Sequence, residues 1–177
     1  MKLEATTIAG VLRITLEPIR DERGFFARSF CFETLRKAGA QFGAIRQMSL
    51  SFNPKVHTLR GLHYQSLEKP EGKIVRVASG RVFDVALDLR TESPSYLRWC
   101  HAELSADAHD ALLIPPGCAH GFLTLENDTT VEYAMDADFD AELARGCRWN
   151  DPLFGIVWPF EPRVIGERDR NWPAFPR

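Results

Sequence analysis

Hydrophobic and polar positions alternate along much of the chain. In residues 11–16 the apolar Leu12, Ile14 and Leu16 lie at every second position, and the same spacing recurs over residues 73–90. A period of two is typical of a β-strand, whose successive side chains point to opposite faces. Further strands are expected at residues 58–65, 111–114, 121–125 and 130–135. The pattern therefore predicts a protein built mainly of short strands.

The segment 73–90 shows how one predicted strand divides its faces. Ser79-Gly80 is expected to form a hairpin turn within it. One face beyond the turn is apolar and carries Phe83, Val85, Leu87 and Leu89. The opposite face is mixed and carries Val82, Asp84, Ala86, Asp88 and Arg90. This mixed face either meets solvent or lines a polar cavity inside a barrel whose other sheet face is buried.

Helical patterns are sparse. We expect one helix over residues 31–39, stopped by Gly39, and a shorter one over residues 140–146, stopped by Gly146. Many short strands with few helices indicate an all-β sandwich or barrel. The 177 residues contain no linker or internal repeat, so residues 1–177 are expected to form a single domain.

Composition and charge narrow the classes of function. Apolar residues make up 45% of the chain and charged residues 26%, values that allow a sizeable core. The net charge of −2 comes without a long charged block, which argues against nucleic-acid and membrane partners and favours a small soluble one. The first residues lack the apolar run of a signal peptide, so a cytoplasmic location is expected.

Four cysteines are scattered along the chain without a C-x-x-C pair. This spacing favours reduced, mostly buried thiols over disulfides or a zinc site. We therefore expect packing roles for all of them, at positions Cys31, Cys100, Cys118 and Cys147.

Titratable side chains gather in HTLRGLHYQ, residues 57–65. Strict alternation places His57 and His63 on one side of this strand and Arg60 on the other. Imidazole is the side chain best matched to proton transfer near neutral pH. A histidine in a strand is also commonly a hydrogen-bonded core or rim residue, and we keep that interpretation for His57.

A second histidine, His120, follows a Pro-x-Gly turn in IPPGCAHGF, residues 114–122. This stretch resembles the second cupin motif, PxGxxH, and points to a small double-stranded β barrel. Many cupins bind a metal through an H-x-H pair, a glutamate and this histidine. Here Gln65 occupies the second position of the pair and is a poor ligand for a transition metal, so no metal or other cofactor is expected.

A site without a metal must take its acid, base and charge stabilisation from side chains. The available groups suit proton abstraction next to a carbonyl, with His63 as base, Tyr133 as proton donor and Lys73 near the developing enolate oxygen. Structural roles remain open for some of them. Tyr133 is also compatible with a core aromatic, Lys73 with a solvated strand start, and Asp84 with a carboxylate at the barrel rim.

Ordered blocks along nearly the whole chain resemble the dTDP-4-dehydrorhamnose 3,5-epimerases and related sugar-nucleotide epimerases of the cupin fold. The blocks are DERGFF (21–26), TLRGLHYQ (58–65), GKIVRVASGRVFDVALDLR (72–90), ESPSY (92–96), IPPGCAHGF (114–122), VEY (131–133) and RWNDPLFGIVWP (148–159).

The resemblance implies a jelly-roll homodimer that inverts C3, and in full family members C5, of a nucleotide-linked 4-keto-6-deoxyhexose. The product would be a deoxysugar precursor of a surface polysaccharide or glycosylated compound. By this resemblance His63 is the base, Asp169 its carboxylate partner, and Tyr133 the proton donor. Lys73 would steady the enolate oxygen. Asp84 and His120 match further polar positions of the substrate site.

The resemblance also implies a set of nucleotide contacts. N-terminal residues of one subunit would help to bind nucleotide at the site of the other. Phe139 takes the position of the aromatic residue that stacks on the base. The remaining positions expected to contact nucleotide or diphosphate are Arg23, Phe26, Gln47, Ser49 and Arg60.

Three positions depart from the family pattern. Arg28 stands where the family has a glutamate, Ser49 where it has an asparagine, and Arg145 where it has another glutamate. A guanidinium cannot replace a hydrogen-bond acceptor, so the identity of the base stays open. A C3-only epimerase of a differently based sugar, such as a CDP-sugar, is one alternative. A 3,4-ketoisomerase, a sugar-binding cupin without turnover and a metal-dependent oxygenase are the others.

Overall fold

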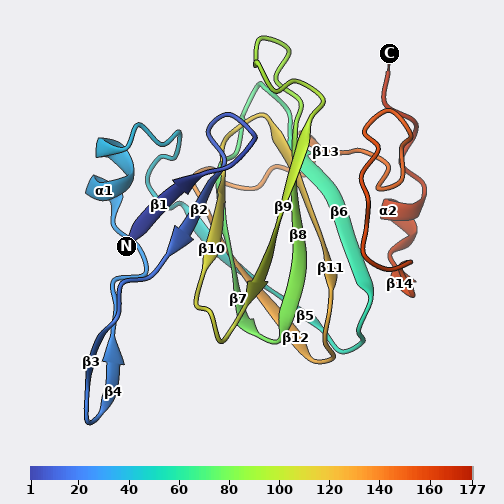
Figure 1. The fold of residues 1–177 in the computed structure, drawn as a ribbon. Coiled ribbons are helices and arrows are strands. Elements are labelled where there is room, and N and C mark those ends of the chain that lie inside the picture. Colours follow the sequence, from blue (N-terminus) through green and yellow to red (C-terminus); the bar gives the residue numbers. More distant parts are fainter. Residues whose placement is uncertain (177) are drawn as a thin grey trace.

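Two antiparallel sheets face each other in the computed structural model, which describes residues 1–176 (Figure 1). The first sheet has the strand order β1-β2-β10-β7-β12-β5. Its strands are β1 (Lys2–Ala5), β2 (Leu12–Thr15), β5 (Gln47–Asn53), β7 (Lys73–Ser79), β10 (Ala111–Ile114) and β12 (Thr129–Met135). Every pairing within this sheet is antiparallel.

The second sheet has the order β13-β6-β11-β8-β9. Its strands are β6 (Thr58–Gln65), β8 (Arg81–Asp88), β9 (Trp99–Ser105), β11 (Cys118–Thr124) and β13 (Ala144–Gly146). A short strand, β14 (Val164–Ile165), adds to β6 in parallel. The remaining elements are the hairpin β3 (Ile19–Asp21) and β4 (Gly24–Phe26) and the helices α1 (Phe32–Lys37) and α2 (Glu167–Arg170). The predicted all-β jelly roll is confirmed.

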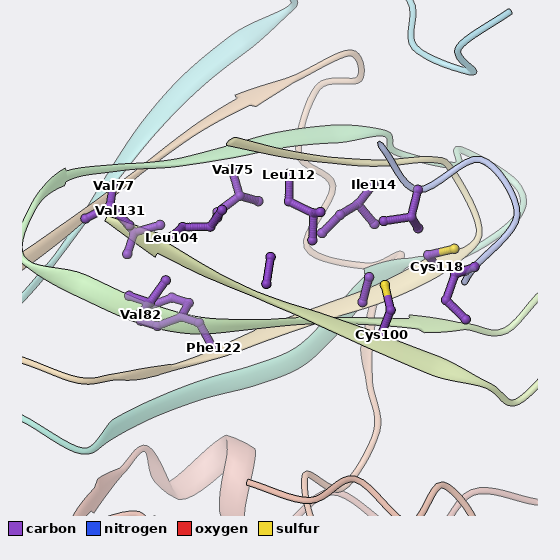
Figure 2. Close-up of a cluster of buried hydrophobic side chains, with 14 residues drawn as sticks. Val75, Val77, Val82, Cys100, Leu104, Leu112, Ile114, Cys118, Phe122 and Val131 are labelled. Atoms are coloured by element: carbon purple, nitrogen blue, oxygen red, sulfur yellow. The ribbon is translucent and has the colours of Figure 1, made fainter. Parts of the chain in front are cut away.

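An apolar core fills part of the space between the sheets (Figure 2). Val75 and Leu112 from the first sheet meet Val82, Ala86 and Phe122 from the second. Each fully buried large apolar side chain stabilises the fold by about 1.5–3 kcal/mol, which is more than an exposed ion pair contributes. This core therefore holds the two sheets together and fixes the position of the polar residues beside it.

The central strands β8 and β11 of the second sheet are buried on both faces. The outer face of this sheet carries Phe83, Val85 and Leu87, which pack with Phe154 and Trp158 of the C-terminal segment. Because this segment covers the apolar face of β8, the mixed face of the same strand turns toward the other sheet. Asp84 and Asp88 are accordingly fully buried, and the mixed face of β8 lies inside the barrel rather than in solvent.

Two local predictions are wrong. Gly80 does lie in a turn, with φ +76°, but β7 and β8 belong to different sheets, so Ser79-Gly80 is a corner and not a hairpin. No helix forms over residues 140–146, where β13 pairs with β6 instead. An isolated helix of two turns is marginal, whereas the edge of β6 offers unpaired backbone groups.

The prediction for residues 31–39 is confirmed by α1, which spans Phe32–Lys37. The described helices are too short to cross a bilayer. The cysteines are free thiols, and Cys100, Cys118 and Cys147 are buried as expected, whereas Cys31 is partly exposed.

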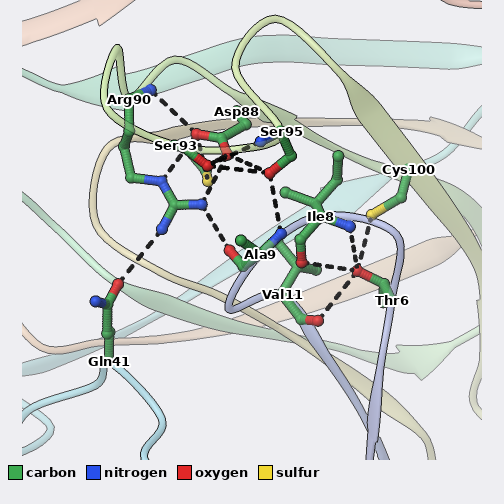
Figure 3. A network of polar contacts seen from close by, with 11 residues as sticks. Thr6, Ile8, Ala9, Val11, Gln41, Asp88, Arg90, Ser93, Ser95 and Cys100 are labelled. Atoms are coloured by element: carbon green, nitrogen blue, oxygen red, sulfur yellow. Dashed lines mark hydrogen bonds and ion pairs between the residues drawn. The ribbon is translucent and has the colours of Figure 1, made fainter.

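A buried carboxylate ties the loop after β8 to the turn between β1 and β2 (Figure 3). Asp88 forms an ion pair of 2.8 Å with Arg90 and accepts hydrogen bonds of 2.5 Å from Ser93 and 2.6 Å from Ser95. Arg90 and Ser95 in turn bind the carbonyl and the amide of Ala9. Burial alone would raise the pKa of Asp88, but the hydrogen bonds from Arg90, Ser93 and Ser95 hold it well below its usual range.

Replacement of this carboxylate should weaken the fold in a pH-dependent way. Asp88→Asn leaves Arg90 buried without its counter-charge, so we expect the free energy of unfolding to fall by about 3 kcal/mol at neutral pH. Because the pKa of Asp88 is lower in the folded state, its contribution is present above the unfolded-state value and disappears on acidification.

Urea titrations of wild type and Asp88→Asn at about pH 7 and about pH 3 measure both effects, and the gap between the two proteins should narrow at the lower pH. Glu103→Gln, which removes an exposed ion pair with Arg81 at 3.9 Å, is the control and should cost less than about 1 kcal/mol. An equal loss in the two variants would contradict the role of Asp88.

Candidate active site

A bulge in β6 places Arg60 and His63 on the same face. His63 lies opposite His120 and Arg60 opposite Phe122, so two residues of β6, Gly61 and Leu62, occupy the length of one residue of β11. An extra residue reverses the alternation of a strand. Leu62 consequently joins Leu59 in the apolar cluster on the outer face. The prediction that Arg60 points away from His63 is wrong.

Arg60 reaches across the barrel toward the first sheet. Its Nε atom donates a hydrogen bond of 2.8 Å to Oδ1 of Asn53, at the end of β5. The charge of Arg60 also lowers the pKa of Tyr133 on β12, although burial of that residue has the larger and opposite effect. Arg60 thus faces the same interior as His63, and its guanidinium stays exposed to solvent.

His63 is held by a carboxylate from the C-terminal helix. Its Nε2 lies 2.6 Å from Oδ1 of Asp169, while Oδ2 of Asp169 accepts a hydrogen bond of 3.0 Å from the Gly61 amide. Burial raises the pKa of Asp169, but the hydrogen bond and charge of His63 and the Gly61 amide outweigh it, so the pKa is lowered. An ionised carboxylate only accepts, so Nε2 is the donor of this contact, and in a neutral ring the free lone pair is then on Nδ1.

His63 opens into a cleft of about 390 Å³ between the two sheets. Six residues singled out from the sequence line this cleft, namely Gln47, Ser49, His63, Lys73, Tyr133 and Phe139. Oε1 of Gln47 accepts a hydrogen bond of 2.9 Å from the Phe139 amide, which fixes the loop that carries this exposed ring. The side chain of His63 is 44% exposed and that of Asp169 only 9%, so the imidazole is the accessible member of the pair.

A second carboxylate and histidine lie deeper in the barrel. Nε2 of His120 is 2.7 Å from Oδ1 of Asp84, and burial raises the pKa of Asp84. The ring of His120 meets that of Tyr133 edge to face, with 5.9 Å between centroids. Burial, and after it the charge of Asp84, raises the pKa of Tyr133, so the phenol is fully protonated at neutral pH. Tyr133 therefore keeps its proton and also packs against the core.

Lys73 is a buried, paired cation. Its Nζ lies 2.9 Å from Oε1 of Glu71, and each side chain is only 9% exposed. The interpretation of Lys73 as a solvated strand start is wrong. Glu71 was not predicted from the sequence, although a carboxylate two residues before a buried lysine is a signal that could have revealed it.

Three predicted nucleotide contacts, Arg23, Phe26 and Arg60, are absent from the cleft lining of this chain. Arg23 and Phe26 belong to the β3–β4 hairpin, which projects away from the two sheets (Figure 1). Arg23 is exposed and forms an ion pair of 2.5 Å with Asp21 of the same hairpin. Phe26 is 74% exposed, an unusual state for a large aromatic side chain without a partner.

Other polar residues near β6 have different roles. His57 stacks on Phe160 at 4.5 Å and is absent from the lining of the cleft. The side-chain amide of Gln65 binds the backbone: its Oε1 accepts a hydrogen bond from the Asp140 amide, and its Nε2 donates one to the Lys69 carbonyl. Among residues 1–176, no three histidine, cysteine or acidic side chains are grouped so that they could hold a metal ion.

Comparison with known proteins identifies the family. The profile described as dTDP-4-dehydrorhamnose 3,5-epimerase matches residues 5–177. The chain belongs to the dTDP-4-dehydrorhamnose 3,5-epimerase family. A relative of that name from Sinorhizobium fredii is 39% identical over 176 residues, which cover 99% of this chain and 90% of the relative.

Solved structures of this epimerase family share the fold. The dTDP-4-dehydrorhamnose 3,5-epimerase from Bacillus anthracis, with TDP and PPi bound, superposes with a TM-score of 0.93 at 34% identity, covering 98% of this chain and 99% of the other. A Legionella pneumophila epimerase in complex with dTDP-4-keto-L-rhamnose gives a TM-score of 0.89 at 32% identity, covering 98% and 92%. The barrel of this epimerase is therefore cupin-like.

The departures from the family pattern fall in different places. Ser49 and Arg145 line the cleft of this epimerase, together with Arg168, which was not predicted from the sequence. Arg28 lies outside the lining and approaches the sulfur of Cys31 at 4.0 Å. The cleft lining thus includes Arg145 and Arg168, whereas Arg60 lies outside it.

The β6 bulge depends on glycine at position 61. Gly61 has φ +121°, and a Cβ there would lie 2.6 Å from the Cα of Gly121 and 2.7 Å from the carbonyl oxygen of His120. Gly24 has nearly the same φ, +122°, but a Cβ added to it would meet nothing within 4 Å. Gly61→Ala should therefore cost more than Gly24→Ala by about 1–3 kcal/mol, the usual penalty for overpacking.

Urea unfolding of both variants measures this difference, because the two substitutions share the strain of a positive φ and differ in the close approach of β11. Equal losses of unfolding free energy would show that the approach of the two strands does not constrain position 61.

Proposed function

We propose that this epimerase inverts C3 and C5 of a dTDP-linked 4-keto-6-deoxyhexose, with His63 as base and Tyr133 as acid. One observation carries the proposal. His63 on β6 and Tyr133 on β12 line the same cleft from opposite sheets, so a sugar between them presents one face to each. The nucleotide sugar and TDP bound to the Legionella and Bacillus relatives support the choice of substrate.

Proton abstraction begins at His63. Its Nδ1 takes the proton from the carbon beside the ketone, and the electron pair of the C–H bond moves to the carbonyl oxygen as an enolate. The ionised Asp169 on Nε2 stabilises the imidazolium that forms. Lys73 supplies the positive charge near the enolate oxygen, since its ammonium lines the same cleft.

Protonation from the other face completes the inversion. Tyr133 gives its phenolic proton to the carbanion, and the enolate electron pair returns to form the new C–H bond. The raised pKa of Tyr133, caused by burial, keeps this proton in place until the carbanion develops. The same pair of groups acts at C3 and C5 because both carbons flank the C4 ketone.

The nucleotide is assigned to the open side of the cleft. Arg60 is exposed and points toward β5, where a guanidinium fork suits a diphosphate. Phe139 is 60% exposed at the cleft lining, and its ring offers a stacking surface for the base. Gln47 and Ser49 lie beside it on β5. Arg145 and Arg168 add positive charge for the phosphates.

A second copy of the chain is assigned to complete the site. The outward side of β5 exposes Met48 by 68%, Leu50 by 69% and Phe52 by 57%, a continuous apolar stripe that favours burial against another protein surface. A twofold dimer uses the same surface on both subunits. The projecting hairpin with Arg23 and Phe26 would then reach the cleft of the partner subunit.

Solvent deuterium tests the assignment of base and acid. Wild type incubated with dTDP-4-keto-6-deoxyglucose in deuterated water should label both C3 and C5. His63→Ala should slow labelling at both carbons by at least about 10²-fold, the usual contribution of a general base. Tyr133→Phe should keep part of the exchange, because His63 can return a deuteron on its own face, yet lose the inverted product.

Mass spectrometry and proton NMR of the recovered sugar count the labelled carbons. Near-normal labelling in His63→Ala would contradict the base assignment. Label at C3 alone in wild type would identify a C3-only epimerase, and binding without any label would identify a sugar-binding protein.

Complementation between variants tests the shared site. Arg23→Ala and His63→Ala should each be nearly inactive at low substrate concentration. Co-expressed in equal amounts, they should recover about a quarter of wild-type activity, because half of randomly assembled dimers are mixed and each holds one intact site.

Co-expression of His63→Ala with Tyr133→Phe is the matched control and should recover nothing, since both residues belong to the same subunit's cleft. No recovery in the Arg23→Ala pair would place Arg23 in its own subunit's site or outside any site.

A further inference from the structure

Asp84 and His120 form a buried acid–base pair that the mechanism above leaves unused. Asp84 is fully buried on β8, and the side chain of His120 on β11 is only 5% exposed. They are joined by the 2.7 Å contact between Oδ1 and Nε2, while Oδ2 of Asp84 has no hydrogen-bond partner among the described residues. A buried carboxylate with one unpaired oxygen is costly when ionised.

The surroundings of the pair favour retention of one proton. The groups that act on Asp84 come from each neighbouring element, with His120 on β11, Lys73 on β7, Cys100 on β9 and Tyr133 on β12. Lys73 is the fixed positive charge in this set, and its own partner is Glu71. Burial is the largest influence on Asp84 and raises its pKa. Asp84 therefore favours its protonated form and stores a proton beside His120.

Double inversion, which rests on the proposed function, creates a need for such a proton. If one bound sugar is inverted at C3 and then at C5, Tyr133 must donate twice while the substrate fills the cleft. After the first donation it is a buried phenolate, a form that its surroundings disfavour. His120, whose ring contacts that of Tyr133, is the adjacent group backed by a stored proton.

We propose that the Asp84–His120 pair is a proton reservoir that re-protonates Tyr133 between the two inversions. The N–H bond of His120 that is not directed at Asp84 breaks, its electron pair stays on the ring, and the proton forms the O–H bond of Tyr133. The proton of Asp84 moves to Nε2 of His120 and leaves a carboxylate. Solvent returns one proton to the pair after the product has left. Asp84 is a positioning residue, because it acts through His120.

The test compares product distributions of wild type and Asp84→Asn in deuterated water. Asparagine keeps the size of aspartate and can still donate to Nε2 of His120, but it holds no transferable acidic proton. We expect the second inversion to slow more than the first, so that the ratio of singly to doubly inverted sugar rises by about tenfold or more. Exchange catalysed by His63 should persist at both carbons.

His120→Asn is the second variant, because its amide can still contact Asp84, and it should shift the product ratio in the same direction. Cys100→Ala, which changes the packing beside Asp84 without removing an acid from the pair, is the control and should leave the ratio at the wild-type value. Thermal melts establish that each variant is folded. If Asp84→Asn is unstable, the product ratio of His120→Asn tests the proposal instead.

The outcomes separate this inference from the proposed function. Wild type that labels fewer than two carbons removes the double inversion on which the reservoir depends. Wild type that labels both carbons, with folded variants that keep its product ratio, overturns the reservoir and leaves the proposed function intact. An equal slowing of both inversions would also overturn it, because loss of a purely structural residue acts on each step alike.

Discussion

Asp169 connects the proposed base to the backbone irregularity that positions it. One carboxylate oxygen binds the imidazole of His63, and the other accepts the amide of Gly61 within the β6 bulge. The same residue thus fixes the orientation of the ring and the local path of the strand. Because the bulge reverses the side-chain alternation, it brings His63, the proposed base, and Arg60, the proposed diphosphate contact, to one face of β6.

The two buried carboxylates of the site lie in opposite electrostatic environments. Asp169 accepts charged and backbone donors, which lower its pKa, whereas Asp84 keeps an unpaired oxygen and has its pKa raised by burial. Such a divergence separates acid from base roles within one site. In the proposed mechanism, Asp169 supports the group that takes protons and Asp84 supports the one that gives them. The Asp84–His120 pair is almost completely buried, whereas His63 of the Asp169–His63 pair is 44% exposed.

Sequence patterns were sufficient for most of the strands and the apolar face of β8, and six of the predicted site residues line one cleft. They could not reveal the bulge, because the sequence around Gly61 and Leu62 is also compatible with a regular strand. The extra residue shows only when β6 is paired with β11. The failed helix at residues 140–146 has a related cause, since the unpaired edge of β6 decided the structure of that segment. Arg168 was missed because only folding brings it to the cleft.

The tautomer of His63 is the most direct test of the proposed mechanism. Nitrogen-15 NMR of the free enzyme, at a pH where the ring is neutral, distinguishes a proton on Nε2 from a proton on Nδ1. Wild type should show the Nε2–H form, held by Asp169, and Asp169→Ala should lose that preference. A proton found on Nδ1 would contradict the mechanism, because the nitrogen assigned to proton abstraction would then have no free lone pair.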